Sequence, residues 1–279
     1  MQVPSLELVA QHACVPLNAN YIRPLGNGAF KSAHLVEISG APYALKVAAL
    51  GPNSQARIER ECDAQRGCAH PAIAKLHQAF AFSDEGANYW VWIEEYLSGG
   101  TLKDRRGSNL LGPDVVRAIA LDMIGALDHL RIRSLVHRDI KPANIIFRTE
   151  SKPVLTDFGI VRALDLPTLT QHFLMAGPGT PAYAAPEQLN NDIALIDWRT
   201  DQFGLAVVLA ECLVGHHPFA PDGDIHDAVV LVASRATLPA TTERALQESN
   251  FVSLARALMP WPHNRYRTPQ QFIDAIRGG

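Results

Sequence analysis

The stretch His137-Arg138-Asp139-Ile140-Lys141-Pro142-Ala143-Asn144 decides the fold of this chain, together with the triplet Asp157-Phe158-Gly159 that follows a short strand-like segment. The first stretch places a carboxylate, a lysine and an amide on one loop. The second adds a carboxylate on a turn with a glycine hinge. Either motif alone is more often an ordinary surface turn. The two together are far more specific, because we put their chance coincidence well below ~1%.

These residue types suit phosphoryl transfer from a Mg²⁺-bound nucleotide. Such a site mainly positions an acceptor hydroxyl and holds metal against the phosphate oxygens. Asp139 would accept the hydroxyl proton or orient the hydroxyl, and Lys141 would place a positive charge near the moving phosphate. Asn144 and Asp157 would supply the hard oxygen ligands that Mg²⁺ prefers.

The composition indicates a globular protein without a bulk electrostatic partner. The chain has 279 residues, of which 47% are hydrophobic and 19% charged, and this length permits one large domain or two closely packed lobes. The formal net charge of -3 gives no reason to expect nucleic acid or an acidic membrane as a partner.

Cysteine spacing and hydropathy favour a cytoplasmic location. The four cysteines are scattered and predict neither a zinc site nor a disulfide framework. The N-terminus lacks a basic region followed by an apolar one, so we expect no signal peptide. The longest apolar run, residues 205–214, is far shorter than the ~20 residues of a membrane span and predicts a buried helix. Membrane attachment through a region outside this chain stays open.

The order of predicted elements indicates an α+β, bilobal chain. Residues 21–50 predict three strands, residues 54–67 a helix, and residues 73–82 and 89–96 two more strands. After Ser98-Gly99-Gly100, helical periodicity predicts helices at 115–130, 201–214, 224–233, 251–258 and 269–276. We therefore expect an N-terminal extension (1–20), a β-rich N-lobe (21–95) and a hinge with a helical C-lobe (96–279). A nucleotide would bind in a cleft between the lobes.

Two features of the first lobe suit phosphate binding. Gly26 and Gly28 lie in a turn between predicted strands, where the backbone N-H groups can approach phosphate oxygens, although ordinary hairpins use such turns as often. Lys46 lies in an apolar strand, where an uncompensated charge is costly. We expect it to pair with phosphates and with a carboxylate of the following helix, Glu61 or, as the competing choice, Glu59. A snorkelling surface lysine is the alternative.

With these motifs in order, the chain resembles a protein kinase of the Ser/Thr type, most like the bacterial eukaryotic-like (Hanks-type) kinases. The resemblance covers residues 21–276. It rests on the glycine-rich turn, Lys46, Glu61 and the Glu95-Tyr96-Leu97 hinge. It continues through residues 137–144 and 157–159, then Gly179-Thr180-Pro181-Ala182-Tyr183-Ala184-Ala185-Pro186-Glu187, Asp201 and Arg265.

The resemblance implies ATP and Mg²⁺ as cofactors, with Mn²⁺ as the alternative metal. It implies that the Glu95 carbonyl and the Leu97 amide hydrogen-bond adenine, which Ala33, Ala44 and Ile146 would cover. It further implies that Glu187 pairs with Arg265 and that Asp201 braces the catalytic loop.

The resemblance also implies protein substrates with Ser or Thr acceptors. Lys141 and Thr180 are similar to residues of Ser/Thr-specific members, and Thr180 would shape the acceptor site. Between Gly159 and Gly179, Thr168 and Thr170 are candidate autophosphorylation sites, because Arg138 could pair with a phosphate there. An ordinary polar loop is the alternative. A homodimer for that autophosphorylation stays open.

Three departures from the family pattern keep other classes in view. Lys31 stands at the usual third glycine, Ala33 replaces the usual valine, and Glu94 occupies the gatekeeper-like position, where a carboxylate needs a donor. These departures are the support for a pseudokinase scaffold, which conflicts with the presence of Lys46 and Asp139. A small-molecule phosphotransferase of similar fold is opposed by the stretch 180–187.

Overall fold

The computed structural model of this chain describes residues 5–27, 31–51, 55–107, 110–157, 181–222 and 224–278. For residues 57, 60, 61 and 64 it describes the backbone alone. The described residues separate into two compact units. Residues 5–69 and 73–98 form the N-terminal unit, and residues 70–72, 99–157 and 181–278 form the C-terminal unit.

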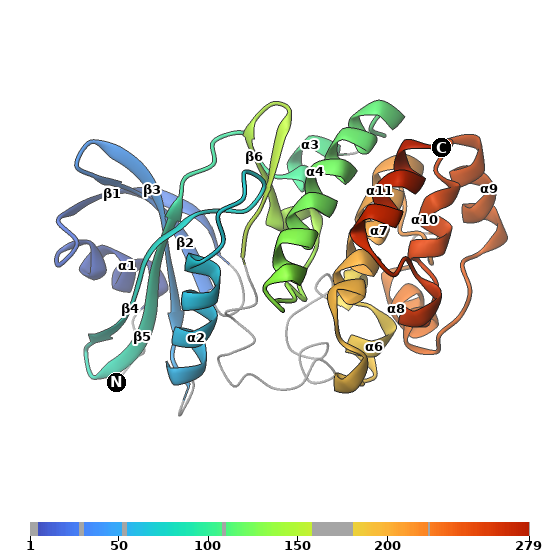
Figure 1. Ribbon diagram of the computed structural model, residues 1–279. Coiled ribbons are helices and arrows are strands. Elements are labelled where there is room, and N and C mark those ends of the chain that lie inside the picture. Colours follow the sequence, from blue (N-terminus) through green and yellow to red (C-terminus); the bar gives the residue numbers. More distant parts are fainter. Residues whose placement is uncertain are drawn as a thin grey trace. The chain divides into compact units, whose positions relative to one another are not determined.

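The N-terminal unit is a five-stranded antiparallel sheet with two helices (Figure 1). Its strands follow the order β1-β2-β3-β5-β4 across the sheet. In the β3–β5 pairing, Lys46 lies opposite Trp92, and Ala44 lies opposite Glu94. In chain order, its elements are α1 (Leu6–Cys14), β1 (Ala19–Asn27), β2 (Lys31–Ile38), β3 (Ala41–Ala49), α2 (Gln55–Arg66), β4 (Leu76–Asp84) and β5 (Ala87–Glu95).

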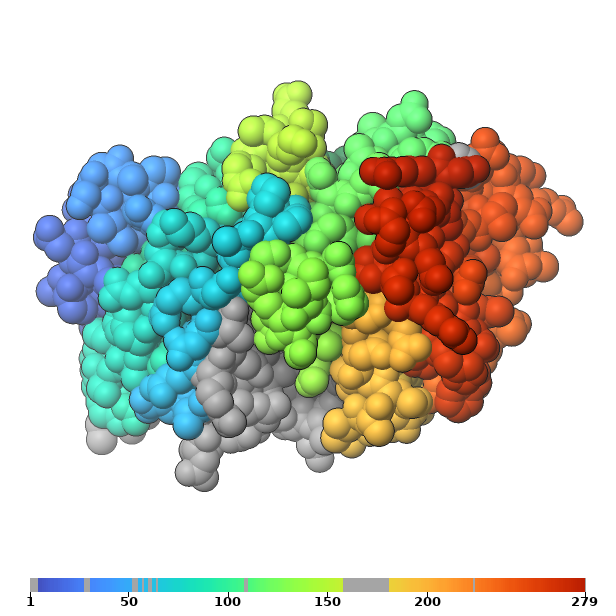
Figure 2. All heavy atoms as spheres, in the orientation of Figure 1, coloured from blue at the N-terminus to red at the C-terminus, as the bar shows by residue number. Residues whose placement is uncertain are grey.

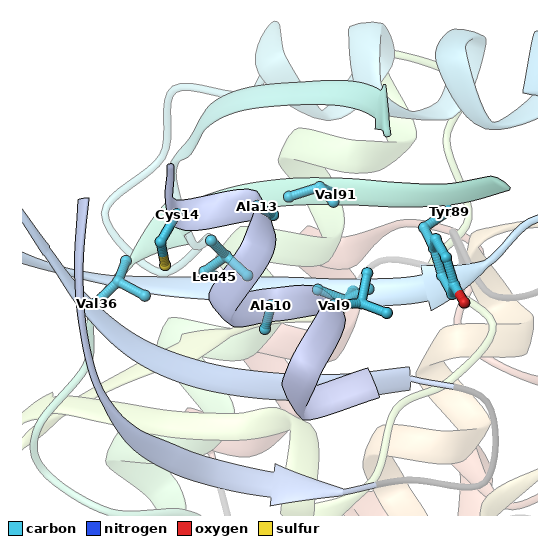
Figure 3. Packing of buried hydrophobic residues seen from close by; sticks show 9 residues of the cluster. Val9, Ala10, Ala13, Cys14, Val36, Leu45, Tyr89 and Val91 are labelled. Atoms are coloured by element: carbon cyan, nitrogen blue, oxygen red, sulfur yellow. The ribbon is translucent and has the colours of Figure 1, made fainter. Parts of the chain in front are cut away.

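The two faces of this sheet carry different helices, because successive residues of a strand point to opposite faces. On one face, Leu45 and Val91 pack with Val9 and Ala13 of α1 (Figure 3). On the other, an apolar cluster joins the sheet to α2, and it comprises Ala48, Ile58, Cys62, Leu76, Trp90 and Trp92. Sequence analysis did not predict α1, which starts where the Ser5 side chain accepts a hydrogen bond from the Leu8 N-H (3.3 Å).

The C-terminal unit is mostly helical and carries one two-stranded sheet, β6–β7. Figures 1 and 2 show α11, in red, against α4, in green, and α4 also packs on α7. Its elements are α3 (Leu102–Arg106), α4 (Pro113–Ile132), the 3₁₀ turn Pro142–Asn144, β6 (Ile145–Thr149), β7 (Lys152–Leu155), the 3₁₀ turn Pro181–Tyr183, α6 (Pro186–Leu189), the 3₁₀ turn Ile193–Leu195, α7 (Trp198–Val214), α8 (Ile225–Ala233), α9 (Ala240–Glu248), α10 (Val252–Ala257), the 3₁₀ turn Pro262–Asn264 and α11 (Pro269–Arg277).

The predicted α+β class is confirmed, with differences in detail. Helix α7 is buried along nearly all of its length, as the apolar run at 205–214 predicts. Helix α9 was not predicted, and two of its residues, Thr242 and Leu246, are buried. Strand β4 begins at Leu76 rather than at 73. Within the described ranges, no helix has the length and apolar character needed to cross a membrane.

Candidate active site

Lys46 and Glu94 form a buried ion pair inside the N-terminal unit. The Lys46 ammonium lies 2.7 Å from Glu94 Oε2, and the two side chains are 6% and 1% exposed. The pairing is possible because β3 and β5 are neighbours, with Lys46 opposite Trp92 and Glu94 two residues further along. The anionic partner that Lys46 was expected to need is thus supplied, at least in part, by a strand.

Sequence analysis did not predict this ion pair, because it chose a carboxylate from the following helix as the partner of Lys46. Glu59 is exposed, and its Oε1 accepts a hydrogen bond from Gln55 (2.9 Å). The Glu61 side chain lies outside the described residues, so its pairing with Lys46 stays a prediction. A strand partner 48 positions away in the sequence carries no helical or short-range spacing signal.

The same ion pair accounts for the carboxylate at the gatekeeper-like position. Glu94 Oε1 accepts hydrogen bonds from Trp92 Nε1 (3.2 Å) and from Gln65 Nε2 (3.3 Å). Both oxygens of the carboxylate are therefore engaged, which offsets the cost of burying its charge. Gln65 and Trp92 are the residues of this cluster that sequence analysis missed.

In the C-terminal unit, Asp201 fixes the backbone of the catalytic loop. Its Oδ2 accepts from the His137 N-H and its Oδ1 from the Arg138 N-H, each at 2.7 Å. Arg138 has a φ of 65°, a left-handed conformation that a side chain disfavours. The two hydrogen bonds stabilise that conformation, and this contact agrees with the bracing role expected of Asp201.

His137 is held neutral beneath this loop. Its Nε2 lies 3.0 Å from the Thr156 carbonyl, and its Nδ1 lies 3.3 Å from the Asp139 backbone nitrogen. Because the backbone N-H can only donate, Nδ1 is an acceptor and Nε2 carries the proton. Burial lowers the pKa of His137 to about 4, with smaller opposing contributions from Asp139 and from the bond to Thr156. The ring therefore shapes the loop without adding charge.

Asp139, Lys141 and Asn144 come together around one carboxylate. Asp139 Oδ2 is 2.9 Å from the Lys141 ammonium and accepts a hydrogen bond from Asn144 Nδ2 (2.8 Å). Asn144 Nδ2 also donates to the Asp139 carbonyl (2.8 Å). The Asp139 side chain is 22% exposed, so it is oriented and still accessible. An oriented, accessible carboxylate beside a lysine can orient a hydroxyl and stabilise a transferring phosphate.

Asn144 lies directly before β6, at the end of a 3₁₀ turn, and Asp157 lies two residues after β7. The Thr156 N-H donates to the Asn144 carbonyl (2.9 Å), which continues the β6–β7 pairing of Ile145 with Leu155. Asn144 uses its Nδ2 group on Asp139, so Oδ1 is the amide atom that could contact a metal ion. Asp157 has a φ of 61°. An amide oxygen and a carboxylate on adjacent segments are ligand types that suit a hard divalent cation such as Mg²⁺.

The other expected binding residues fall in both units. Gly26, Ala33, Ala44, Glu95 and Leu97 belong to the N-terminal unit, where Gly26 pairs with Ala33 across β1 and β2. Ile146 belongs to β6 of the C-terminal unit. Four further predicted site residues lie outside the described residues: Gly28, Thr168, Thr170 and Thr180. The assigned roles of all these residues stay predictions.

Comparison with known proteins identifies the family. The model of the protein kinase domain matches residues 19–274. The chain belongs to the protein kinase family. It is 32% identical over 275 residues to the serine/threonine-protein kinase PknF of Mycobacterium tuberculosis, covering 91% of this chain and 55% of that protein. It is 30% identical over 229 residues to the serine/threonine-protein kinase PknB of Mycobacterium leprae, covering 81% of this chain and 36% of that protein.

These matches confirm the predicted likeness to bacterial kinases of the Ser/Thr type. The chain spans about half or less of the length of these curated relatives.

A further buried carboxylate lies next to the segment that follows Thr180. Glu211 of α7 accepts a hydrogen bond from the Tyr183 hydroxyl through Oε2 (2.7 Å) and pairs with Arg106 through Oε1 (3.0 Å). Burial raises the pKa of Tyr183, so its hydroxyl remains a donor. Sequence analysis missed this contact, although a lone glutamate in the apolar run at 205–214 was the available signal.

Proposed function

We propose that this kinase transfers the γ-phosphate of ATP to Ser or Thr hydroxyls of proteins. The single observation that carries the proposal is the cluster of Asp139, Lys141 and Asn144, in which the carboxylate contacts both partners at 2.8–2.9 Å. That arrangement is the one phosphoryl transfer needs, and it speaks against an inactive scaffold. The names of the relatives support Ser and Thr as the acceptors.

The proposed roles follow from the contacts. Asp139 orients the acceptor hydroxyl and takes its proton, and Asn144 holds that carboxylate in place. Asn144 Oδ1 and Asp157 hold Mg²⁺, which neutralises phosphate charge when bound. Lys46 contacts nucleotide phosphates. The Glu95 carbonyl and the Leu97 amide bind adenine.

A protein acceptor is favoured over a metabolite by the segment that ends in Glu187. Glu187 pairs with Arg265 at 2.7 Å, and Tyr183 is tied to Glu211. Small-molecule kinases of similar fold usually lack such a loop. The anchored segment would support an extended peptide substrate, and Thr180 would be one of the residues that contact this substrate.

The decisive experiment is γ-phosphate transfer from ATP-Mg²⁺ to a generic Ser/Thr protein acceptor and to the kinase itself, with products read by mass spectrometry. Asp139→Asn should lower turnover by ~10² to 10⁴-fold, because a positioned base is lost. Asp128→Asn is the matched control, since Asp128 is 39% exposed and pairs with Arg131 on α4. Equal activity of wild type and Asp139→Asn would refute the role of Asp139.

The same products test autophosphorylation. We propose Thr170 or Thr168 as the site. Once the phosphate is attached to threonine, the Arg138 guanidinium would form an ion pair with it. Double substitution of Thr168 and Thr170 by Ala should abolish phosphate incorporation into the kinase while retaining transfer to the added acceptor. Incorporation that persists at other residues would contradict this assignment.

A further inference from the structure

Glu94 lies at the polar end of the sheet face that packs on α2. Trp92 and Glu94 point to that face because they are two residues apart on β5, and Lys46 joins them from β3. Further along the same face, Ala48 and Trp90 pack with Cys62 of α2. The buried cluster on this face is thus apolar, and Lys46 and Glu94 meet at one end of it.

The carboxylate of Glu94 is held from three directions. Oε2 lies 2.7 Å from the Lys46 ammonium, while Oε1 accepts from Trp92 and from Gln65 of α2. Lys46, Gln65, Trp92 and Glu94 are each 5% exposed or less. Because both of its oxygens are fixed, the carboxylate does not move with the lysine side chain. It can therefore hold that side chain in one position.

Fold stability alone does not account for this arrangement. A buried ion pair is often no more stabilising than apolar side chains of similar size, because desolvation offsets the attraction between the charges. Small and aromatic residues already fill the neighbouring part of the face. A charged pair at this end therefore indicates a use for the lysine in a fixed, ionised state.

We propose that Glu94 is a positioning residue for Lys46, so that the ammonium is presented to nucleotide phosphates. This inference rests on the proposed role of Lys46 in phosphate binding. An ammonium carries three hydrogens, so the Lys46 side chain can donate to a phosphate oxygen while it donates to Glu94. Because β3 and β5 are hydrogen-bonded neighbours, the strand-to-strand spacing sets the position of the ammonium relative to Glu94.

The test compares ATP with adenosine, which share the base and sugar and differ in the phosphates. Glu94→Gln keeps an oxygen acceptor and removes the charge, so it should weaken ATP binding and lower kcat/KM by about 10- to 100-fold. Adenosine affinity should be unchanged, because adenosine has no phosphate for Lys46. Glu37→Gln, the same change on β2 of the same sheet, should alter neither ligand.

A second variant guards against misfolding of the first. Trp92→Phe keeps a large aromatic ring and removes only the Nε1 donor to Glu94 Oε1. It should shift ATP affinity in the same direction by a smaller factor, again without an effect on adenosine.

Several outcomes would overturn the proposal. Equal losses for ATP and adenosine would assign Glu94 to the nucleobase pocket or to folding, and raised activity in Glu94→Gln would make the pair an inhibitory latch. Wild-type protein that binds ATP without transferring phosphate would refute the proposed function and leave the ligand comparison valid. Wild-type protein that binds no ATP would refute both.

Discussion

Arg265 and Glu187 form an ion pair from which water is excluded. Two guanidinium nitrogens of Arg265 lie 2.7 and 3.0 Å from the two oxygens of Glu187, and both side chains are 0% exposed. Burial lowers the pKa of Arg265, and the contact with Glu187 opposes that effect. Thr200 also donates to Glu187 Oε1 (2.9 Å). The pair therefore joins α6 to the segment before α11, 78 residues later.

Arg265→Met should leave Glu187 buried without its counter-ion. We expect the free energy of unfolding to fall by about 3–5 kcal/mol, the range found when one partner of a buried pair is removed. Urea unfolding at neutral pH measures this change. Arg267→Met is the control, because Arg267 is exposed and only two residues away. A loss no larger than that of the control would show that the pair contributes little to stability.

Asp201→Asn should impair catalysis more than folding. Asparagine offers one acceptor oxygen, so one of the N-H groups of His137 and Arg138 loses its partner. Displacement of Asp139 should then lower kcat by about 10- to 100-fold. We expect a stability loss of about 1–3 kcal/mol for the unsatisfied group. Steady-state kinetics measures kcat of Asp201→Asn and of the control Asp274→Asn, which changes an exposed residue of α11. Equal kcat values for the two variants would contradict the bracing role of Asp201.

Lys46→Met should destabilise the N-terminal unit as well as impair nucleotide binding. Glu94 would remain buried with its charge and without the ammonium, at a cost of about 3 kcal/mol. Adding Glu94→Gln should recover most of that loss, because the amide oxygen still accepts from Trp92 and Gln65 while the charge is gone. Thermal or urea unfolding of the single and double variants measures the recovery. A double variant less stable than Lys46→Met would count against the charge argument.

Stability should fall as the pH is lowered from about 6.5 towards 4. Burial lowers the pKa of His137 and of His217 from 6.5 to about 4. Between these values the unfolded chain binds protons that the folded chain does not, so acid favours unfolding. Above pH 6.5 the two histidines are neutral in the folded and in the unfolded state, so their full contribution to the free energy of unfolding is present.

His217→Asn tests the origin of this dependence. His217 donates from Nε2 to the Ala182 carbonyl (2.7 Å) and accepts from the Phe219 N-H (3.2 Å), which fixes the neutral ring. The variant should be less stable at pH 7 and should show a shallower loss between pH 6.5 and 5 in urea unfolding. An unchanged slope would mean that other groups carry the proton linkage.

Much of the site could be predicted from short-range sequence order. Asp139, Lys141 and Asn144 lie within six residues, so one loop carries all three side chains. The contact of Asp201 with the loop, and that of Glu187 with Arg265, could be predicted only through the family resemblance. The positions of these residues in the sequence give no signal for contacts between residues that are 63 to 78 positions apart.

The contact of Lys46 with Glu94 is one that sequence analysis did not predict. Helical proximity favoured Glu61 or Glu59, while the structure joins Lys46 to Glu94 through the β3–β5 register. Strand pairing is set by the whole sheet, and a one-residue change of register would turn Glu94 to the opposite face. The same limit hid α1, because its apolar residues acquire a partner only when the sheet face with Leu45 and Val91 exists.

The sequence by itself determined the kinase family, the α+β class and the catalytic loop, because these depend on residue types at fixed, short spacings. The tertiary structure decided which buried charges meet: Lys46 with Glu94, Glu211 with Arg106 and Tyr183, and both N-H groups of the loop with Asp201. The physical reason is desolvation. A buried charge must find a partner in the folded state, and only the packing of distant segments determines which partner lies within hydrogen-bonding distance.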